Sequence, residues 1–357
     1  MTVKGKKLLR GVLNTLLPIL AAFLVGGIII ALIGENPFTT YKVMIEKSLF
    51  SYNGLMKTLH MASPLILTGL AIAVTFKANI FNMGVEGQML LGALFAAVVG
   101  FTFDLPPALH ILVCLLTGVA VGVLFALIPA ILKAYFKVNE MVVTLMLNYV
   151  AIEFAKFLAQ GVYKDPASGY VATYAIHDSA MFNKLGGTSI TWFFFIALLG
   201  FCVMYFVMRR SRLGYEITAI GKNPEFAEAS GMKVSRKIIF MMVISGALSG
   251  LAGAGYLMSE KFRYTLDFSG SPGLGWDGML IALLGGHNPV GILVAAIFYA
   301  ALKTGSEYIG LFTNVPKEIV GVIQGILILM LSVKFINENV LRTRTRRFVR
   351  QNNAKGE

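Results

Sequence analysis

Long apolar stretches, separated by short polar segments, recur along nearly the whole chain. Many windows of about 18 or more residues are almost uncharged, which is long enough for a helix to cross a bilayer. Residues 34–60 are predicted to form an outer loop with amphipathic helical character, 161–190 a second outer loop, and 77–87 a segment that is irregular at membrane depth. The pattern predicts about ten membrane-spanning helices, at residues 11–33, 61–76, 88–103, 109–132, 139–160, 191–208, 238–258, 274–286, 291–308 and 317–335.

The composition agrees with this pattern. Hydrophobic residues make up 57% of the 357 residues and charged residues only 14%, whereas a soluble domain has about 25% charged residues. The mean hydropathy is +0.74. These values favour an all-α polytopic integral membrane protein over a soluble globular one. The two cysteines, Cys114 and Cys202, fall inside predicted spans and indicate buried small side chains rather than a disulfide or a metal site.

The net charge of +13 follows the positive-inside rule rather than the pattern of a nucleic-acid-binding surface. Basic residues gather in residues 4–10, in the loop 209–237 and in residues 342–350, while the predicted outer loops are nearly balanced in charge. Both termini are therefore predicted to be cytoplasmic. The first apolar run is too long for the hydrophobic part of a signal peptide, so it is predicted to be an uncleaved span.

One polar segment, residues 219–232, stands out between two apolar runs. Asn223 can cap a helix, Pro224 suits the first helical position, and Glu225 meets the positive end of the helix dipole. Gly231 can end the helix in a left-handed conformation. We predict a short, capped, amphipathic helix on the inner face of the membrane, where a partner outside this chain docks.

Two short segments suggest an internal repeat. Residues 84–90 (Gly-Val-Glu-Gly-Gln-Met-Leu) are similar to residues 275–280 (Gly-Trp-Asp-Gly-Met-Leu), and interrupted stretches precede both, at 79–84 and 269–275. In the predicted topology the two copies enter the membrane from opposite sides, as in an inverted-topology repeat with broken helices. The alternative is a chance match between glycines that merely allow close packing.

Three stretches, residues 76–89, 219–231 and 275–286, resemble the inner-membrane permease subunits of bacterial ATP-binding-cassette (ABC) importers. The resemblance is to the branch for ribose-type sugars, nucleosides and branched-chain amino acids. The run from Phe81 to Gln88 (Phe-Asn-Met-Gly-Val-Glu-Gly-Gln) looks most like guanosine-type nucleoside permeases. A multi-pass protein of the bacterial cell membrane is implied, forming half of a path for nucleosides, with ribose-type sugars as the alternative.

The implied organisation is a single transmembrane permease domain with a short cytoplasmic segment before it and a basic tail after it. Its repeat halves stand on either side of the polar loop. The boundaries are 1–10 for the N-terminal segment, 11–336 for the domain, about 61–160 and 238–335 for the halves, 209–237 for the loop and 337–357 for the tail.

In that family the short cytoplasmic helix is the coupling helix, which inserts into a groove on the ATPase subunit; the alternative is an ordinary amphipathic helix resting on lipid. The chain has no Gly-x-x-x-x-Gly-Lys-Ser/Thr loop, so the ATPase, with its ATP and Mg, must be a separate polypeptide. A substrate-binding lipoprotein and a second, paralogous permease chain are the other implied partners, and no cofactor is expected in this chain. ATPase coupling is assigned to Gly221, Lys222, Asn223, Pro224, Glu225, Phe226, Glu228 and Gly231.

Polar and aromatic side chains within the spans are the candidates for the substrate path. Glu86 and Asp277 occupy equivalent places in the two halves, where each could bind a substrate or could cap the helix that it opens. Aromatic rings could stack on a nucleobase while amides read its edge. The candidates are Asn79, Phe81, Asn82, Glu86, Gln88, Glu140, Asn148, Trp276 and Asp277.

Two other functions stay open. A secondary transporter or channel would explain the repeat and the buried carboxylates, but it leaves the capped helix unexplained. An intramembrane protease needs two aspartates on facing spans, or a serine with a histidine in reach. Only Asp277 lies in a predicted span, and His287 lies at its cytoplasmic edge. The chain is therefore predicted not to be an enzyme.

Overall fold

A computed structural model describes residues 3–269, 273–316, 318–326 and 329–330. Within them the chain is helical, with short π-helical and 3₁₀ turns and three isolated β-bridges in its loops. The α-helices are α1 (Val3–Leu32), α2 (Pro37–Ile45), α3 (Tyr52–Phe76), α4 (Val85–Thr102), α5 (Pro107–Phe136), α6 (Glu140–Phe157), α7 (Trp192–Arg210), α8 (Arg212–Lys222), α9 (Pro224–Ala229), α10 (Val234–Tyr256), α11 (Leu266–Ser269), α12 (Leu274–Leu284) and α13 (Pro289–Phe312).

The chain divides into two compact units, and α13 contributes residues to both. The smaller unit comprises Met1–Lys47 and Leu302–Glu357. There the Tyr41 hydroxyl of α2 donates a hydrogen bond to the Phe23 carbonyl of α1 at 2.6 Å, so a polar contact joins these two helices.

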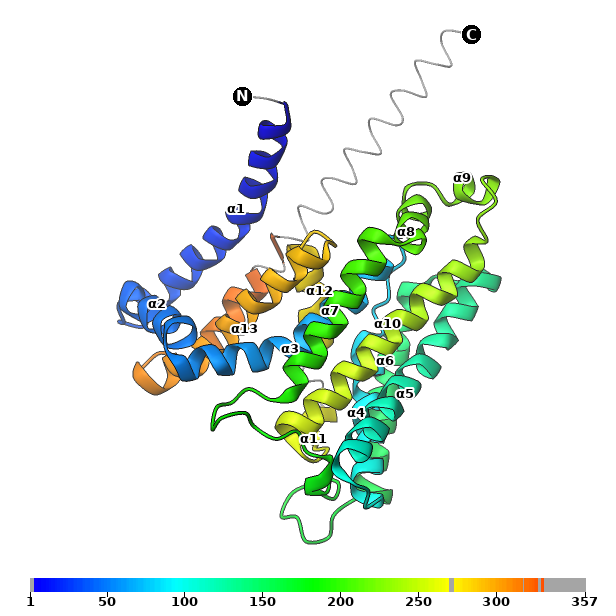
Figure 1. Ribbon diagram of the computed structural model, residues 1–357. Helices are drawn as coiled ribbons and strands as arrows, with labels where there is room; N and C mark the ends of the chain where they lie inside the picture. Colours follow the sequence, from blue (N-terminus) through cyan, green and yellow to red (C-terminus); the bar gives the residue numbers. More distant parts are fainter. Residues whose placement is uncertain (1–2, 270–272, 317, 327–328, 331–357) are drawn as a thin grey trace. The chain divides into compact units, whose positions relative to one another are not determined.

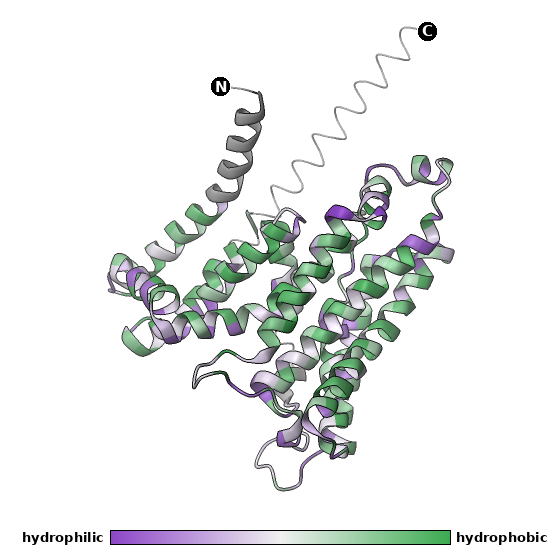
Figure 2. Cartoon of the chain, viewed as in Figure 1, coloured by the Kyte–Doolittle hydropathy of each residue, from purple (hydrophilic) through white to green (hydrophobic). Residues whose placement is uncertain are grey.

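The larger unit, Ser48–Ala301, is built around α10, which packs against α3, α4 and α5, and α4 also packs on α5 (Figure 1). α12 and α7 pack on α3, and α6 packs on α4. α3 and α4 are mostly buried, whereas α5, α6 and α7 expose many leucine, valine and phenylalanine side chains (Figure 2). This distribution places the apolar outer faces of α5, α6 and α7 where lipid would contact them.

The polytopic membrane architecture predicted from the sequence is confirmed. Among the described residues, seven helical segments are long and apolar enough to cross a membrane: Tyr52–Phe76, Val85–Thr102, Pro107–Phe136, Glu140–Val162, Trp192–Arg210, Val234–Lys261 and Pro289–Phe312. Two shorter apolar segments, Pro18–Leu32 and Leu274–Leu284, coincide with further predicted spans. The predicted span 317–335 lies only partly within the described residues, and the tail 337–357 lies entirely outside them. The inverted orientation of the repeat stays a prediction.

α3 begins nine residues earlier than predicted, inside the supposed outer loop. The predicted start of this helix was wrong because polar residues interrupt the apolar pattern there. In the folded chain these residues have hydrogen-bond partners. Thr58 donates to the Ser48 carbonyl at 3.0 Å, and the buried His60 ring lies 3.2 Å from the Glu260 carboxylate. Buried polar groups with such partners extend the helix without a desolvation penalty.

Glycines bring α5 and α10 into direct backbone contact. Gly118 and Gly122 on α5 face Gly246 and Gly250 on α10, with each pair spaced four residues apart. A β carbon added at Gly250 would lie 2.0 Å from the Gly118 carbonyl oxygen, and one added at Gly122 would lie 2.3 Å from the Gly246 carbonyl oxygen. Close approach of this kind holds membrane helices together where lipid supplies no hydrophobic driving force.

Of the two cysteines, Cys114 is buried as expected, but Cys202 is exposed on α7. The expectation that both are buried was wrong for Cys202 because α7 turns this face away from the helix bundle. Both cysteines are free.

Candidate functional site

The polar segment that interrupts the apolar pattern forms two helices rather than one. α9 begins as predicted: the Asn223 side chain accepts a hydrogen bond from the Phe226 N–H at 3.0 Å, with Pro224 in the first position. Gly231 follows with φ 85°, in the left-handed region. The Phe226 side chain is 70% exposed. We call α8, α9 and the residues up to Lys233 the polar loop; it lies at one end of the larger unit (Figure 1).

α8 anchors the polar loop to the bundle. The Ser211 side chain caps its start by accepting from the Gly214 N–H at 3.3 Å, and Ile217 and Ile220 are buried. Sequence reasoning missed this helix, although the Ser211 cap and the apolar spacing of Leu213, Ile217 and Ile220 were signals for it.

The last turn of α8 touches the first broken segment, residues 77–84, through backbone atoms. A β carbon at Gly221 would lie 2.1 Å from the Lys77 carbonyl oxygen. The Asn79 side chain donates to the Gly221 carbonyl at 2.6 Å, and Asn79 itself has φ 56°. Asn79, a predicted path residue, therefore joins the polar loop to the broken segment.

Inside the bundle, the broken segment is held by buried amides. Asn82 donates to the Ser245 hydroxyl on α10 at 2.8 Å and accepts from the Gly84 N–H at 3.0 Å. It also donates to the Gln88 side chain of α4 at 3.2 Å. Both amides are almost fully buried, so they position the start of α4.

α6 holds the same segment from another side. The Glu140 carboxylate pairs with Lys133 of α5 at 2.7 Å and accepts from the Phe81 N–H at 3.3 Å. Asn148 donates to the Met83 carbonyl at 2.6 Å. Glu140 and Asn148, two predicted path residues on one face of α6, thus both contact the broken segment.

Glu86 links the two broken segments. Its carboxylate is 1% exposed and accepts hydrogen bonds from the Gly273 N–H at 3.1 Å and the Gly275 N–H at 2.6 Å. These N–H groups begin α12, where a negative charge is favourable. Glu86, in the first turn of α4, therefore caps the start of α12.

We expect Glu86→Gln to lower the stability of the larger unit by about 2–4 kcal/mol. An amide offers one acceptor oxygen where the carboxylate offers two, and a hydrogen bond to a charged group contributes about 1.5–3 kcal/mol. The measurement is the thermal unfolding midpoint of purified protein in detergent. The matched control is Glu153→Gln, because Glu153 is exposed and, among the described residues, forms an ion pair only with Lys156, three residues on. Equal midpoints for the two variants would contradict this role of Glu86.

Trp276 and Asp277 differ from the other candidates. Trp276 is 38% exposed, and the half-buried Asp277 accepts from the Tyr299 hydroxyl of α13. Phe81 is half-buried with its ring 4.8 Å from that of Phe76. The structure thus gathers Asn82, Glu86, Gln88, Glu140 and Asn148 around the broken segment as buried contacts, and leaves Trp276 the most open of the spanning candidates.

Three contributors were missed from the sequence: Ser245, Lys133 and Thr144. The Thr144 hydroxyl accepts from the Met83 N–H at 3.1 Å. Thr144 lies four residues from both Glu140 and Asn148, so helical spacing alone could have placed it on the same face of α6 as these two residues. Ser245 had no such signal, because its partner Asn82 is 163 residues away. Lys133 is close to Glu140 in sequence but lies on a different helix, so helical spacing does not pair them.

His287, between α12 and α13, packs against Phe76 with ring centroids 5.6 Å apart. Burial, together with the positive charge of Lys77, lowers the pKa of His287 to about 4 from its usual 6.5. Burial and Arg209 likewise lower the pKa of Lys77. The junction beside the first broken segment therefore favours a neutral imidazole.

This pKa makes stability depend on pH. The unfolded chain binds a proton at His287 near the usual pKa of 6.5, whereas the folded chain binds it only near 4. The stability that comes from the neutral His287 is therefore complete above about pH 6.5 and is lost as the pH falls toward about 4. Between about pH 7 and pH 5, wild type should lose at most about 2 kcal/mol more than His287→Gln. Thermal midpoints in detergent measure this, and identical pH profiles would refute it.

Comparison with known proteins decides the family. Residues 54–332 match the branched-chain amino acid transport system permease component family. The guanosine ABC transporter permease protein NupP of Bacillus subtilis is 34% identical over 335 residues, covering 92% of this chain and 95% of that protein. The chain belongs to the ABC-transporter permease family. The nucleoside permease NupB of Lactococcus lactis is also 34% identical, covering 93% of each chain, as is the glucose permease TsgB13 of Haloferax volcanii, over 88% and 85%.

The permease is thus a transport subunit of the cell membrane and not an enzyme. Membership of this family decides against the two alternative functions that the sequence left open, a secondary transporter or channel and an intramembrane protease. An ABC permease works with an ATPase and a binding protein. Bacillus subtilis has two guanosine permease proteins, NupP and NupQ, and NupQ is 27% identical over 73% of this chain.

Proposed function

We propose that this permease forms half of a nucleoside path in an ABC importer. The observation that carries the proposal is the similarity to guanosine and nucleoside permeases along more than nine tenths of each chain. The run from Phe81 to Gln88, which resembles the same run of nucleoside permeases, forms hydrogen bonds with α6, with α10 and with the start of α12. A glucose permease of equal identity makes ribose-type sugars the second candidate.

Uptake by cells that express the complete importer tests the cargo. Labelled guanosine should enter in an ATP-dependent manner, and unlabelled adenosine or uridine should compete while ribose and glucose should not. Competition by the sugars and not by nucleosides would replace the nucleoside proposal with the sugar one. Uptake that continues without the ATPase subunit would overturn the importer reading itself.

We further propose that the ATPase docks on the polar loop, with this loop and both termini on the cytoplasmic side and a paralogous permease chain as the second half. Phe226 is exposed on α9 with Glu225 and Glu228 beside it, as an anchor in a groove requires. α8 then contacts the broken segment through Gly221. A movement of the docked loop would therefore reach Asn82 and Glu86 through continuous contacts.

Phe226→Ala should weaken ATPase binding about tenfold to 100-fold, because a buried aromatic anchor commonly contributes 2 kcal/mol or more to an interface. The matched control is Tyr170→Ala, another exposed aromatic, in the loop at the opposite end of the larger unit. Co-purification of the ATPase with each variant, followed by its transport-stimulated ATP hydrolysis, measures the effect. Unchanged binding for Phe226→Ala would contradict docking on α9.

For the substrate path, we propose that Trp276 and Asp277 face the cargo. The buried candidates Asn82, Glu86, Gln88, Glu140 and Asn148 would act on it by positioning the broken segments. This division rests on exposure: Trp276 is open, whereas these five side chains are buried.

A further inference from the structure

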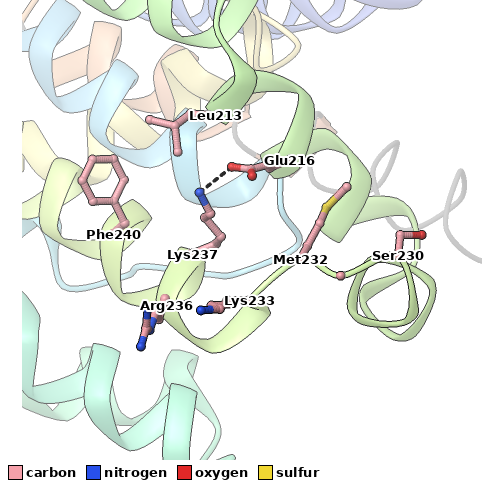
Figure 3. Close-up of a pocket in the computed structure, with 9 residues that line it drawn as sticks. Leu213, Glu216, Ser230, Met232, Lys233, Arg236, Lys237 and Phe240 are labelled. Atoms are coloured by element: carbon pink, nitrogen blue, oxygen red, sulfur yellow. Dashed lines mark ion pairs between the residues drawn. The ribbon is translucent and has the colours of Figure 1, made fainter.

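A pocket of about 810 Å³ opens beside the polar loop, where α8, the connection after α9 and the first turns of α10 meet (Figure 3). Leu213 and Glu216 line it from α8, and Lys233, Arg236, Lys237 and Phe240 line it from the α10 side. Neither the proposed cargo path nor the contacts of Gly221 use this pocket.

The pocket carries excess positive charge. Lys237 pairs with Glu216 at 2.6 Å across one side of it (Figure 3). Lys233 and Arg236 are exposed, lie near each other in Figure 3, and form no ion pair with any residue in the described ranges. Three cations and one carboxylate leave two positive charges in excess, so the pocket favours an anion.

One wall of the pocket is apolar and close to the membrane. Phe240 is 45% exposed and lies within α10, which is apolar and long enough to span. Leu213 lies three residues after the end of α7, another spanning helix. The pocket therefore joins the boundary of the apolar region to a cluster of cations, an arrangement that suits a ligand with a charged head and an apolar tail.

We propose that this pocket binds the headgroup of an anionic phospholipid, with Lys233 and Arg236 at the phosphate and with Leu213 and Phe240 along the first part of the acyl chains. A soluble phosphate would use the cations but would leave the apolar wall in water. An acidic segment of the partner ATPase could also meet the cations, but it would gain nothing from side chains at the membrane boundary.

The lipid would fix the position of the polar loop. Lys233 directly precedes α10 and follows the left-handed Gly231, so a headgroup held by Lys233 and Arg236 restrains the connection that leads from α9. Only this consequence depends on the proposed docking of the ATPase on α9; binding of the lipid does not.

The test titrates purified full-length permease in a neutral detergent with phosphatidylglycerol or phosphatidylcholine. Native mass spectrometry counts bound lipid, and the thermal midpoint reports stabilisation. We expect phosphatidylglycerol to bind and stabilise, and phosphatidylcholine to do neither at equal concentration. Lys233→Gln with Arg236→Gln should weaken phosphatidylglycerol binding about 30-fold, from two lost charge contacts.

The matched control is Arg210→Gln with Arg212→Gln, which removes two exposed cations of the same region that do not line the pocket. This variant should bind phosphatidylglycerol within about twofold of wild type. Equal weakening of both double variants would reduce the effect to general surface charge and overturn the proposal. Unchanged binding in the Lys233 and Arg236 variant would overturn it as well.

Two further arms separate the other occupants. Water-soluble glycerol 3-phosphate that stabilises as strongly as phosphatidylglycerol would assign the pocket to free phosphate. Loss of bound lipid on adding the ATPase, together with weakened ATPase binding in Lys233→Gln with Arg236→Gln, would assign it to the partner. Equal thermal midpoints of wild type and both variants without added lipid confirm that folding is intact. ATPase binding is scored separately, so a failed docking proposal leaves the lipid result interpretable.

Discussion

Replacing Gly221 by alanine should reduce ATP-driven uptake by about tenfold or more while leaving the protein in the membrane. The added β carbon would lie 2.1 Å from the Lys77 carbonyl oxygen and 3.0 Å from the α carbon of Ala78, both backbone atoms that cannot rotate away. Overpacking of this kind costs about 1–3 kcal/mol, and 1.4 kcal/mol changes an equilibrium tenfold. The end of α8 must therefore move off the broken segment.

The comparison that isolates this effect uses three variants. Gly161→Ala adds the same methyl group where nothing lies within 4 Å, and should be neutral. Asn79→Ala removes the hydrogen bond to the Gly221 carbonyl without a clash, and should cause a smaller loss. Uptake and ATP hydrolysis are measured together. Full uptake in Gly221→Ala would show that this contact transmits nothing.

The second large effect is expected at the contact between α5 and α10. Gly250→Ala should destabilise the larger unit by about 2–4 kcal/mol, because its β carbon would lie 2.0 Å from the Gly118 carbonyl oxygen and 3.2 Å from the α carbon of Gly122. The helices can accept it only by separating, which loses the close packing that joins helices in lipid. We expect a lower thermal midpoint and less protein recovered from membranes.

Gly200→Ala supplies the control, since Gly200 also lies in the middle of a spanning helix, α7. Its β carbon would meet only the end of the flexible Leu67 side chain, at 2.8 Å. There the gain in helix propensity, up to about 1 kcal/mol, offsets the small adjustment. If the two alanine variants have equally lowered thermal midpoints, the destabilisation comes from replacing a helix glycine as such and not from the backbone contact.

Local signals predicted local structure well in this chain. The cap at Asn223, the proline after it and the left-handed Gly231 gave both ends of α9, because each acts within one helical turn. The break near residue 79 was also expected from its own residues. The family, and with it the transport role, followed from three short stretches of sequence and is confirmed by the comparisons.

Contacts between distant residues could not be predicted. Asn79 was assigned to the cargo path because it is polar and near a break, yet its partner is 142 residues away in the polar loop. Glu86 was open to either of two roles, and its hydrogen bonds to Gly273 and Gly275 depend on how α12 meets α4. The start of α3 was placed too late for the same reason, since the partners of its buried polar residues, such as Glu260 for His60, come from distant parts of the chain.

The contact between α8 and the broken segment is made by main-chain atoms at Gly221 and Lys77. At that point the fold constrains residue 221 and its hydrogen-bond partner Asn79, while Lys222, Glu225, Phe226 and Glu228 are exposed. With the ATPase docked on α9 as proposed, partner choice and force transmission would be chemically separable. Exchanging the four exposed residues for those of another permease should then redirect the chain to that permease's ATPase. Two importers with different ATPase subunits could in this way function in one cell.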